Sequence, residues 1–197
     1  MKTTLPLLAA TLVLAACSLA PTVPAKAVYD LGPAPAAPAS GGAIAWRVAD
    51  VTAPPWLGSD GIAYRLNFEQ AQRLQHYRDS LWAAPPADLL TQRLREQLAT
   101  PPGCARGPAA LLAVNLDEFE QVFVSPTASE VVLRLHATLW PAAASGAAQQ
   151  RHWRVARPAA TPDAPGAVRA LAQAVDDVVP QIAGWLAASA CDQTSSR

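Results

Sequence analysis

The chain has 197 residues, of which 51% are hydrophobic, and its 15 basic and 15 acidic side chains give a formal net charge of zero. A balanced charge provides no electrostatic attraction to nucleic acid or to an anionic surface, so we expect no nucleic-acid partner. The hydrophobic fraction and the six tryptophans indicate a packed globule rather than a disordered chain.

The first 16 residues have the pattern of an export signal. Lys2 supplies a positive charge, and an uncharged, largely apolar segment follows up to Cys17. This segment is shorter than the roughly 20 apolar residues that a spanning helix needs. We therefore expect residues 1–16 to be a signal peptide that is removed on export.

The end of this signal, Leu14-Ala15-Ala16-Cys17, resembles a bacterial lipobox. That resemblance implies a diacylglycerol on the Cys17 thiol and, after cleavage, a further acyl chain such as palmitate on its amino group. Two or three acyl chains anchor a protein stably, whereas one chain holds only marginally. Ser18 follows the cysteine, and this resembles the signal for sorting to the outer membrane in enteric-type bacteria. The alternative is a plain signal peptide with a chance cysteine.

The segment after the signal predicts a tether followed by one domain. Residues 17–27 contain the cysteine and a proline-interrupted arm, which would extend about 30 Å at roughly 3.1 Å per residue. The domain is expected at 28–191, a length that suits a single hydrophobic core. Residues 192–197 would then form a short C-terminal tail.

Two other cysteines are present, Cys104 in a Pro-Gly loop and Cys191 just after the last predicted helix. An even pair in an oxidising compartment predicts a disulfide between them. The alternative is two unpaired thiols. Two cysteines without a nearby histidine fall short of four zinc ligands, so no metal or other cofactor is expected.

Alternation of apolar and polar residues predicts strands in the first half of the chain. A short strand at 28–31 is followed by a loop at 33–43, and two more strands are expected at 44–52 and 62–66. The polar, aromatic-bearing stretch between Leu66 and Trp82 is interpreted as a loop.

A helix is predicted to begin near Pro86, because proline fits the first turn of a helix. Leu90, Leu94 and Leu98 then recur every four residues, and the sequence Pro101-Pro102-Gly103 ends the helix. One face of this helix is therefore expected to be buried.

The second half predicts a three-stranded antiparallel meander and a long helix. The strands, joined by short links, are expected at 111–124, 129–140 and 149–157. The helix spans about 163–189 with one apolar stripe, and Pro180 inside it should kink or interrupt it. The fold class is therefore α+β: a largely antiparallel sheet with two helices packed on one face, as a two-layer sandwich.

Catalytic motifs are not evident, and we do not expect an enzyme. His136 and His152 lie on neighbouring predicted strands and could approach each other, but two imidazoles fall short of a zinc site. Asp117, Glu118 and Glu120 form an acidic cluster, which we interpret as a solvated sheet edge that discourages strand addition.

The stretch 62–98 carries a family resemblance. A Tyr64-Arg65 strand, a polar loop, Trp82 with Pro85 and the leucine-rich helix follow in that order, and a strand with Phe119 comes later. In this combination the chain resembles the ABC-type transport auxiliary lipoprotein family, which includes the paraquat-inducible protein C lipoproteins. The lipobox and the final helix lie where that family has them.

The resemblance implies a non-catalytic role beside a mammalian-cell-entry-type lipid transport system that supports envelope integrity. The protein would be anchored through Cys17 to the periplasmic face of the outer membrane, with the inner membrane as the less favoured site. Its partner would be a tunnel-forming or substrate-binding subunit, and homo-oligomers are also implied. The alternative is a periplasmic carrier that binds an acyl chain in its own cavity.

Four side chains are candidates for the surface that binds a partner, because Trp, Tyr and Arg dominate interface hot spots. They are Trp56, Tyr64, Arg65 and Trp82. Trp56, in the sequence APPWLGSD, is expected to be the most exposed. The other interpretation of Tyr64 and Trp82 is that they are ordinary core aromatics.

Overall fold

A computed structural model describes residues 25–36, 46–98, 109–141 and 147–194, with side chains up to Ser189 in the last helix. In these ranges a seven-stranded sheet forms one layer. Its strands are β1 (Ala27–Tyr29), β2 (Trp46–Val48), β3 (Gly61–Leu66), β4 (Leu74–Trp82), β5 (Ala110–Ser125), β6 (Ala128–Trp140) and β7 (Gln149–Pro158).

The sheet is mixed, with strand order β1-β4-β3-β5-β6-β7 and β2 alongside the first part of β5. The pairs β5–β6 and β6–β7 are antiparallel, which confirms the predicted meander, and β3–β4 is antiparallel as well. The pairs β1–β4, β2–β5 and β3–β5 are parallel, so the expectation of a largely antiparallel sheet is not confirmed. A parallel neighbour requires a crossover, and the chain makes one through β4 and a helix between β3 and β5.

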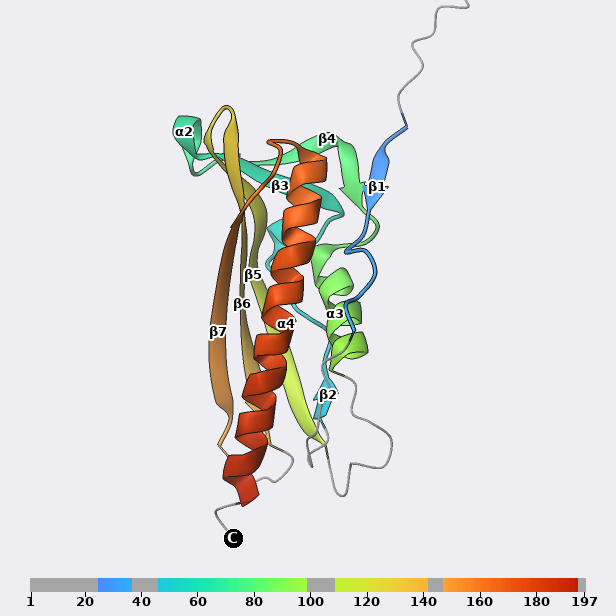
Figure 1. Cartoon of the computed structure of the whole chain (residues 1–197), viewed down its shortest axis with the longest axis vertical. Coiled ribbons are helices and arrows are strands. Elements are labelled where there is room, and N and C mark those ends of the chain that lie inside the picture. Colours follow the sequence, from blue (N-terminus) through green and yellow to red (C-terminus); the bar gives the residue numbers. More distant parts are fainter. Residues whose placement is uncertain (1–24, 37–45, 99–108, 142–146, 195–197) are drawn as a thin grey trace, which may run out of the picture.

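Two longer helices complete the core. Helix α3 (Pro86–Gln97) begins at the predicted proline, and α4 (Ala164–Thr194) matches the predicted last helix. Helix α4 packs along β5, β6 and β7, whereas α3 lies beside α4 and β2 (Figure 1). The expected arrangement of two helices on one sheet face is therefore not confirmed.

The apolar stripe predicted for the last helix is the centre of the core. Its members are all buried: Val168, Leu171, Val175, Val178, Ile182 and Trp185. The Trp185 ring meets that of Trp153 on β7 edge-on, with centroids 5.6 Å apart. Helix α4 continues through Pro180, which is exposed, and the predicted interruption does not occur. Because proline has no N–H, the carbonyl oxygen one turn earlier in the helix lacks its usual hydrogen bond. On the exposed side of α4, water can donate to this oxygen instead.

Shorter elements connect these parts. A single 3-10 turn, η2 (Pro55–Leu57), precedes β3, and a one-turn helix, α2 (Asn67–Gln70), separates β3 from β4. Strand β4 occupies most of the stretch that was expected to be a loop. This strand is held between β1 and β3, and its polar residues are exposed or half-buried on both faces, so sequence alternation alone did not reveal it.

Candidate functional site

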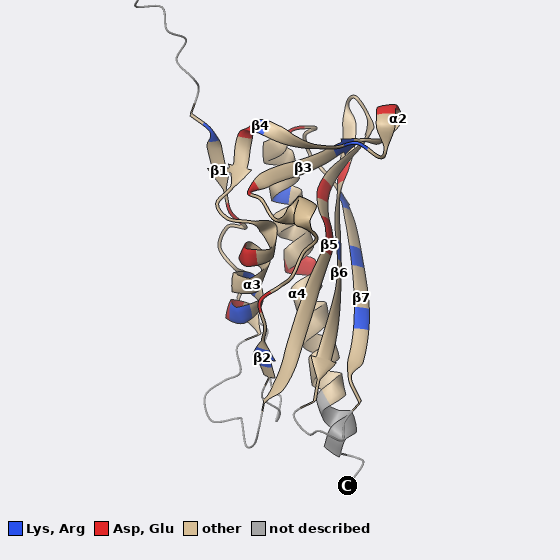
Figure 2. Ribbon diagram, turned by 180° about the vertical axis from the view of Figure 1, so that it is seen from behind, with Lys and Arg blue, Asp and Glu red and all other residues tan. Residues whose placement is uncertain are grey.

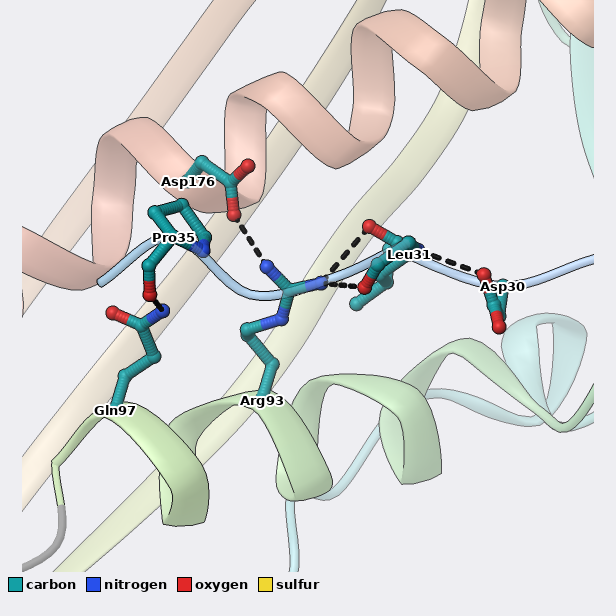
Figure 3. A network of polar contacts seen from close by, with 7 residues as sticks. Asp30, Leu31, Pro35, Arg93, Gln97 and Asp176 are labelled. Atoms are coloured by element: carbon teal, nitrogen blue, oxygen red, sulfur yellow. Dashed lines mark hydrogen bonds and ion pairs between the residues drawn. The ribbon is translucent and has the colours of Figure 1, made fainter. Parts of the chain in front are cut away.

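The chain that leads from the predicted anchor is fixed to the domain by Arg93 (Figure 3). Its side chain is only 4% exposed and belongs to α3. One terminal nitrogen donates to the Asp176 carboxylate at 2.6 Å, and the other donates to the carbonyl oxygens of Leu31 at 2.9 Å and Gly32 at 2.7 Å. A single guanidinium therefore joins the segment after β1 to both α3 and α4.

Neighbouring contacts complete this arm-holding site. One turn further along α3, the Gln97 amide donates to the carbonyl oxygen of Pro35 at 2.8 Å. Gly32 has φ +67, in the left-handed region that favours glycine, and its N–H donates to the Asp30 carboxylate at 2.8 Å. The segment thus turns where Arg93 can reach two consecutive carbonyl groups.

The electrostatics of the arm-holding site depend on Asp176. Burial raises the pKa of its carboxyl group, the Arg93 guanidinium opposes that rise, and the neighbouring Asp177 carboxylate adds to it. Asp177 has its own partner in Arg157 of β7. Asp176 consequently depends on Arg93 for compensation of its charge.

Trp56 marks a second candidate site, in the 3-10 turn η2 before β3. Its side chain is 56% exposed. It borders a pocket of about 460 Å³, whose lining residues are Thr52, Ala53, Pro54, Trp56, Asn115, Leu116, Asp117, Arg134 and His136. Arg134 and His136 lie on one face of β6, because the odd-numbered residues of β6 are buried on the other.

A β-bulge in β5 builds the charged floor of this pocket. The register of β5 with β6 shifts between Leu116 and Glu118, so Asp117 is the additional residue. The Asp117 carboxylate lies 3.0 Å from His136 Nδ1, and Glu118 lies 3.0 Å from Arg134. The expectation of a solvated edge at this acidic cluster is wrong, since β5 runs between β3 and β6.

The predicted approach of His136 and His152 is confirmed. The two residues are paired across β6 and β7, and their ring centroids are 5.3 Å apart. Within the described ranges, no three histidine, cysteine, aspartate or glutamate residues gather in a way that could hold a metal ion.

Tyr64 and Arg65 point to opposite faces of β3 and make internal contacts. The Tyr64 ring lies against the Tyr77 ring, with centroids 4.8 Å apart. Arg65 Nε donates to both carboxylate oxygens of Glu120, at 2.8 and 2.9 Å. Burial raises the pKa of Glu120 while Arg65 opposes that rise, so this pair joins β3 to β5 rather than presenting free charge.

Trp82 lies in the core. It is 1% exposed and packs against Phe119, with ring centroids 5.5 Å apart. Its side chain cannot reach a partner in this conformation, and the interpretation as a core aromatic applies instead. Of the four candidates, only Trp56 presents most of its side chain to solvent.

The cysteines lie beyond the described side chains. Cys17 and Cys104 fall outside the described residues, and Cys191 lies in α4 where side chains are not described.

The sequence analysis did not identify Arg93 as a functional residue. Its one available signal was its position three residues after Leu90, which places both on the same face of the helix.

Comparisons with known proteins agree with this architecture. The family model described as "ABC-type transport auxiliary lipoprotein component" matches residues 29–183. The chain belongs to the ABC-type transport auxiliary lipoprotein family. The match begins within β1 and ends within α4, so the family domain includes both the arm-holding site and the Trp56 pocket. Membership in this family implies membrane anchoring and association with an ABC transport system.

Two solved structures have a similar fold. A protein from Xanthomonas campestris assigned to family DUF330 is 21% identical, covers 88% of this chain and 97% of its own, and has a TM-score of 0.66. An uncharacterized protein is 20% identical, with coverage of 83% and 99% and a TM-score of 0.63. The search of curated proteins found no match. Among the helices of the described residues, none is both long and apolar enough to cross a bilayer.

Proposed function

We propose that this auxiliary lipoprotein is a non-catalytic docking component of a mammalian-cell-entry-type lipid transport system that supports envelope integrity. Acyl chains on Cys17 anchor it to the periplasmic face of the outer membrane. The domain then docks a tunnel-forming or substrate-binding subunit. The family membership supports the transport role, and the lipobox-like sequence at the start of the chain supports the anchor.

The observation that carries the docking role is the exposed Trp56 beside a charged pocket. An indole with 56% of its surface in water, next to Arg134 and Asp117, combines the residue types that dominate binding energy at protein interfaces. Two residues that line the pocket, Arg134 and His136, alternate on β6 with the buried odd-numbered residues, and Figure 2 shows α4 behind the sheet. A protein partner that buries this indole would gain apolar contact beside the ion pairs that line the pocket.

Replacing Trp56 by alanine tests the docking surface. We expect Trp56→Ala to lower the recovery of the tunnel-forming subunit, after crosslinking and purification through the lipoprotein, by at least about tenfold, the effect of losing a hot spot. The matched control is Trp140→Ala, because Trp140 is exposed to a similar extent, 52%, at the far end of β6. Unchanged recovery with Trp56→Ala, or an equal loss with Trp140→Ala, contradicts the assignment.

The carrier alternative is less well supported by this fold. An acyl chain needs a largely apolar cavity of several hundred Å³. The pocket beside the arm, about 320 Å³, includes Asp30, Arg93 and Glu96 in its walls, and the Trp56 pocket is also charged. A further pocket of about 470 Å³ beside β1 and α4 has more apolar walls, which include Val28, Leu31 and Val168, but it is open to solvent and does not enclose an acyl chain. The space between the sheet and α4 is filled by the buried stripe of α4. A docking role therefore agrees better with the described part of the molecule.

We also propose that Cys104 and Cys191 form a disulfide. The segment that contains Cys104 is flanked by Leu98 at the end of α3 and Ala110 at the start of β5, and both lie toward the end of the molecule where α4 finishes (Figure 1). We expect the mature protein to show no thiol reactive to maleimide before reduction and two afterwards, measured by mass. Two reactive thiols in protein purified without reductant contradict the pairing.

A further inference from the structure

The end of the molecule formed by α2 and the β5–β6 turn exposes apolar side chains. Phe68 on α2 is 41% exposed, and Val124 just before the turn is 58% exposed. Leu66 pairs with Phe123 in the parallel β3–β5 ladder, and α2 lies against β5. Phe68 and Val124 therefore occupy the same end of the fold, at the top of Figure 1.

Hydrogen bonds brace the backbone close to both residues. Arg65, which is paired with Glu120, also donates to the carbonyl oxygen of Ala71 at 3.2 Å, directly after α2. In the β5–β6 turn, the Ala128 N–H donates to the Ser125 hydroxyl at 3.1 Å. The two apolar side chains thus belong to fixed structures, which reduces the entropy lost when they bind a surface.

The chain from the proposed anchor enters the fold in the same half of the molecule. Ala25 is the first described residue and leads directly into β1, which lies in the upper half of Figure 1, whereas α4 finishes at the lower end. Seven residues lie between Cys17 and Ala25, so the connection has eight Cα–Cα steps and spans at most about 28 Å. Strand β5 alone, with 16 residues, spans about 50 Å. A short connection therefore favours the upper end as the one nearest the anchoring membrane.

Charged groups at this end have both signs. Lys26 and Arg73 are exposed cations, Glu69 on α2 is an exposed anion, and Arg78 pairs with Asp79 at 2.8 Å. A mixture of this kind suits a zwitterionic phospholipid headgroup, which offers a phosphate and an ammonium. Apolar side chains among charged ones are the pattern of a surface that lies in a membrane interface.

We propose that the end formed by α2 and the β5–β6 turn rests on the phospholipid surface that holds Cys17, with Phe68 and Val124 in its headgroup region. The acyl anchor sets how far the domain can lie from the membrane. The second contact also sets its orientation, with the long axis of the domain pointing away from the membrane. The Trp56 pocket faces sideways in that orientation and remains accessible to a protein partner. This inference rests on the proposed acylation of Cys17.

Photocrosslinking of the full-length protein in the cell envelope tests the contact. The photoreactive residue p-benzoylphenylalanine replaces Phe68 in one variant, Val124 in a second and Trp140 in a third. Trp140 is the control because it is 52% exposed at the opposite end of β6. We expect adducts with the mass of one phospholipid at positions 68 and 124, at a yield at least about tenfold above that at position 140.

Three outcomes overturn the proposal: no phospholipid adduct at either position, equal yields at all three, or capture of protein alone at positions 68 and 124. Capture of a second copy of this chain would identify an oligomer interface there instead. The mass of the Cys17 peptide is measured on the same samples. An acylated peptide without lipid adducts contradicts only the surface contact, whereas an unacylated peptide contradicts the proposed anchor itself.

Discussion

Replacing Cys17 with serine is expected to abolish acylation and remove the protein from the outer membrane. A serine hydroxyl is not the thiol that accepts diacylglycerol, and each buried methylene of the missing chains contributes about 0.8 kcal/mol of membrane affinity. The fraction that sediments with outer-membrane vesicles should fall at least about tenfold. Metabolic labelling with palmitate and the intact mass of the purified chain measure the modification directly.

Controls for this prediction use residues of the same types. Cys104→Ser and Cys191→Ser should keep the palmitate label. Lys26 is the only lysine after the signal peptide and it is exposed, so a lysine-specific protease should cut there and release the domain from wild-type membranes. A Cys17→Ser protein that still sediments with outer-membrane vesicles, processed or not, contradicts the anchor.

Arg93→Met is expected to lower the free energy of unfolding by about 3 kcal/mol, as for other buried ion pairs that lose one partner. Methionine keeps an aliphatic stem of similar length but cannot donate to Asp176 or to the carbonyl oxygens of Leu31 and Gly32. Those acceptors then lose a charged donor in a largely buried site. The midpoint of urea unfolding, at unchanged slope, measures the loss.

The matched control is Arg95→Met on the same helix. Arg95 pairs with Asp50 at 2.8 Å, but both side chains are mostly in water, at 52% and 86% exposure. Such a pair contributes at most about 1 kcal/mol. Equal effects of the two substitutions would mean that Arg93 has no special role in holding the arm.

The deficit of Arg93→Met should also depend on pH. Burial already raises the pKa of Asp176, and without the opposing guanidinium this folded-state pKa rises further above its unfolded value. A folded state that binds a proton more tightly than the unfolded state gains stability as pH falls through the raised pKa. The difference between wild type and variant should therefore shrink from about pH 7 to about pH 4. A constant difference contradicts the role of Asp176.

Helices and strands with a periodic pattern of apolar residues were predictable, because that pattern lies within the segment itself and shows which residues are buried. The α4 stripe from Val168 to Trp185 repeats with the helical period, and the alternation around Leu133 and Leu135 repeats with the strand period. Strand β4 was missed because its neighbours on both sides, rather than its own composition, make it a strand. The candidate site was predicted only in part: Trp56 is exposed as expected, whereas Trp82 is packed on Phe119.

The sequence alone determined the elements with clear periods, the family and the lipobox-like segment at Cys17, since each is a pattern of neighbouring residues. Only the tertiary structure decided that β3 lies parallel to β5, that Arg93 binds a segment about sixty residues earlier, and that Phe68 and Val124 share one end. Such contacts join residues far apart in the chain. The free energy of these contacts depends on which surfaces the whole fold brings together, and a local sequence pattern does not predict that.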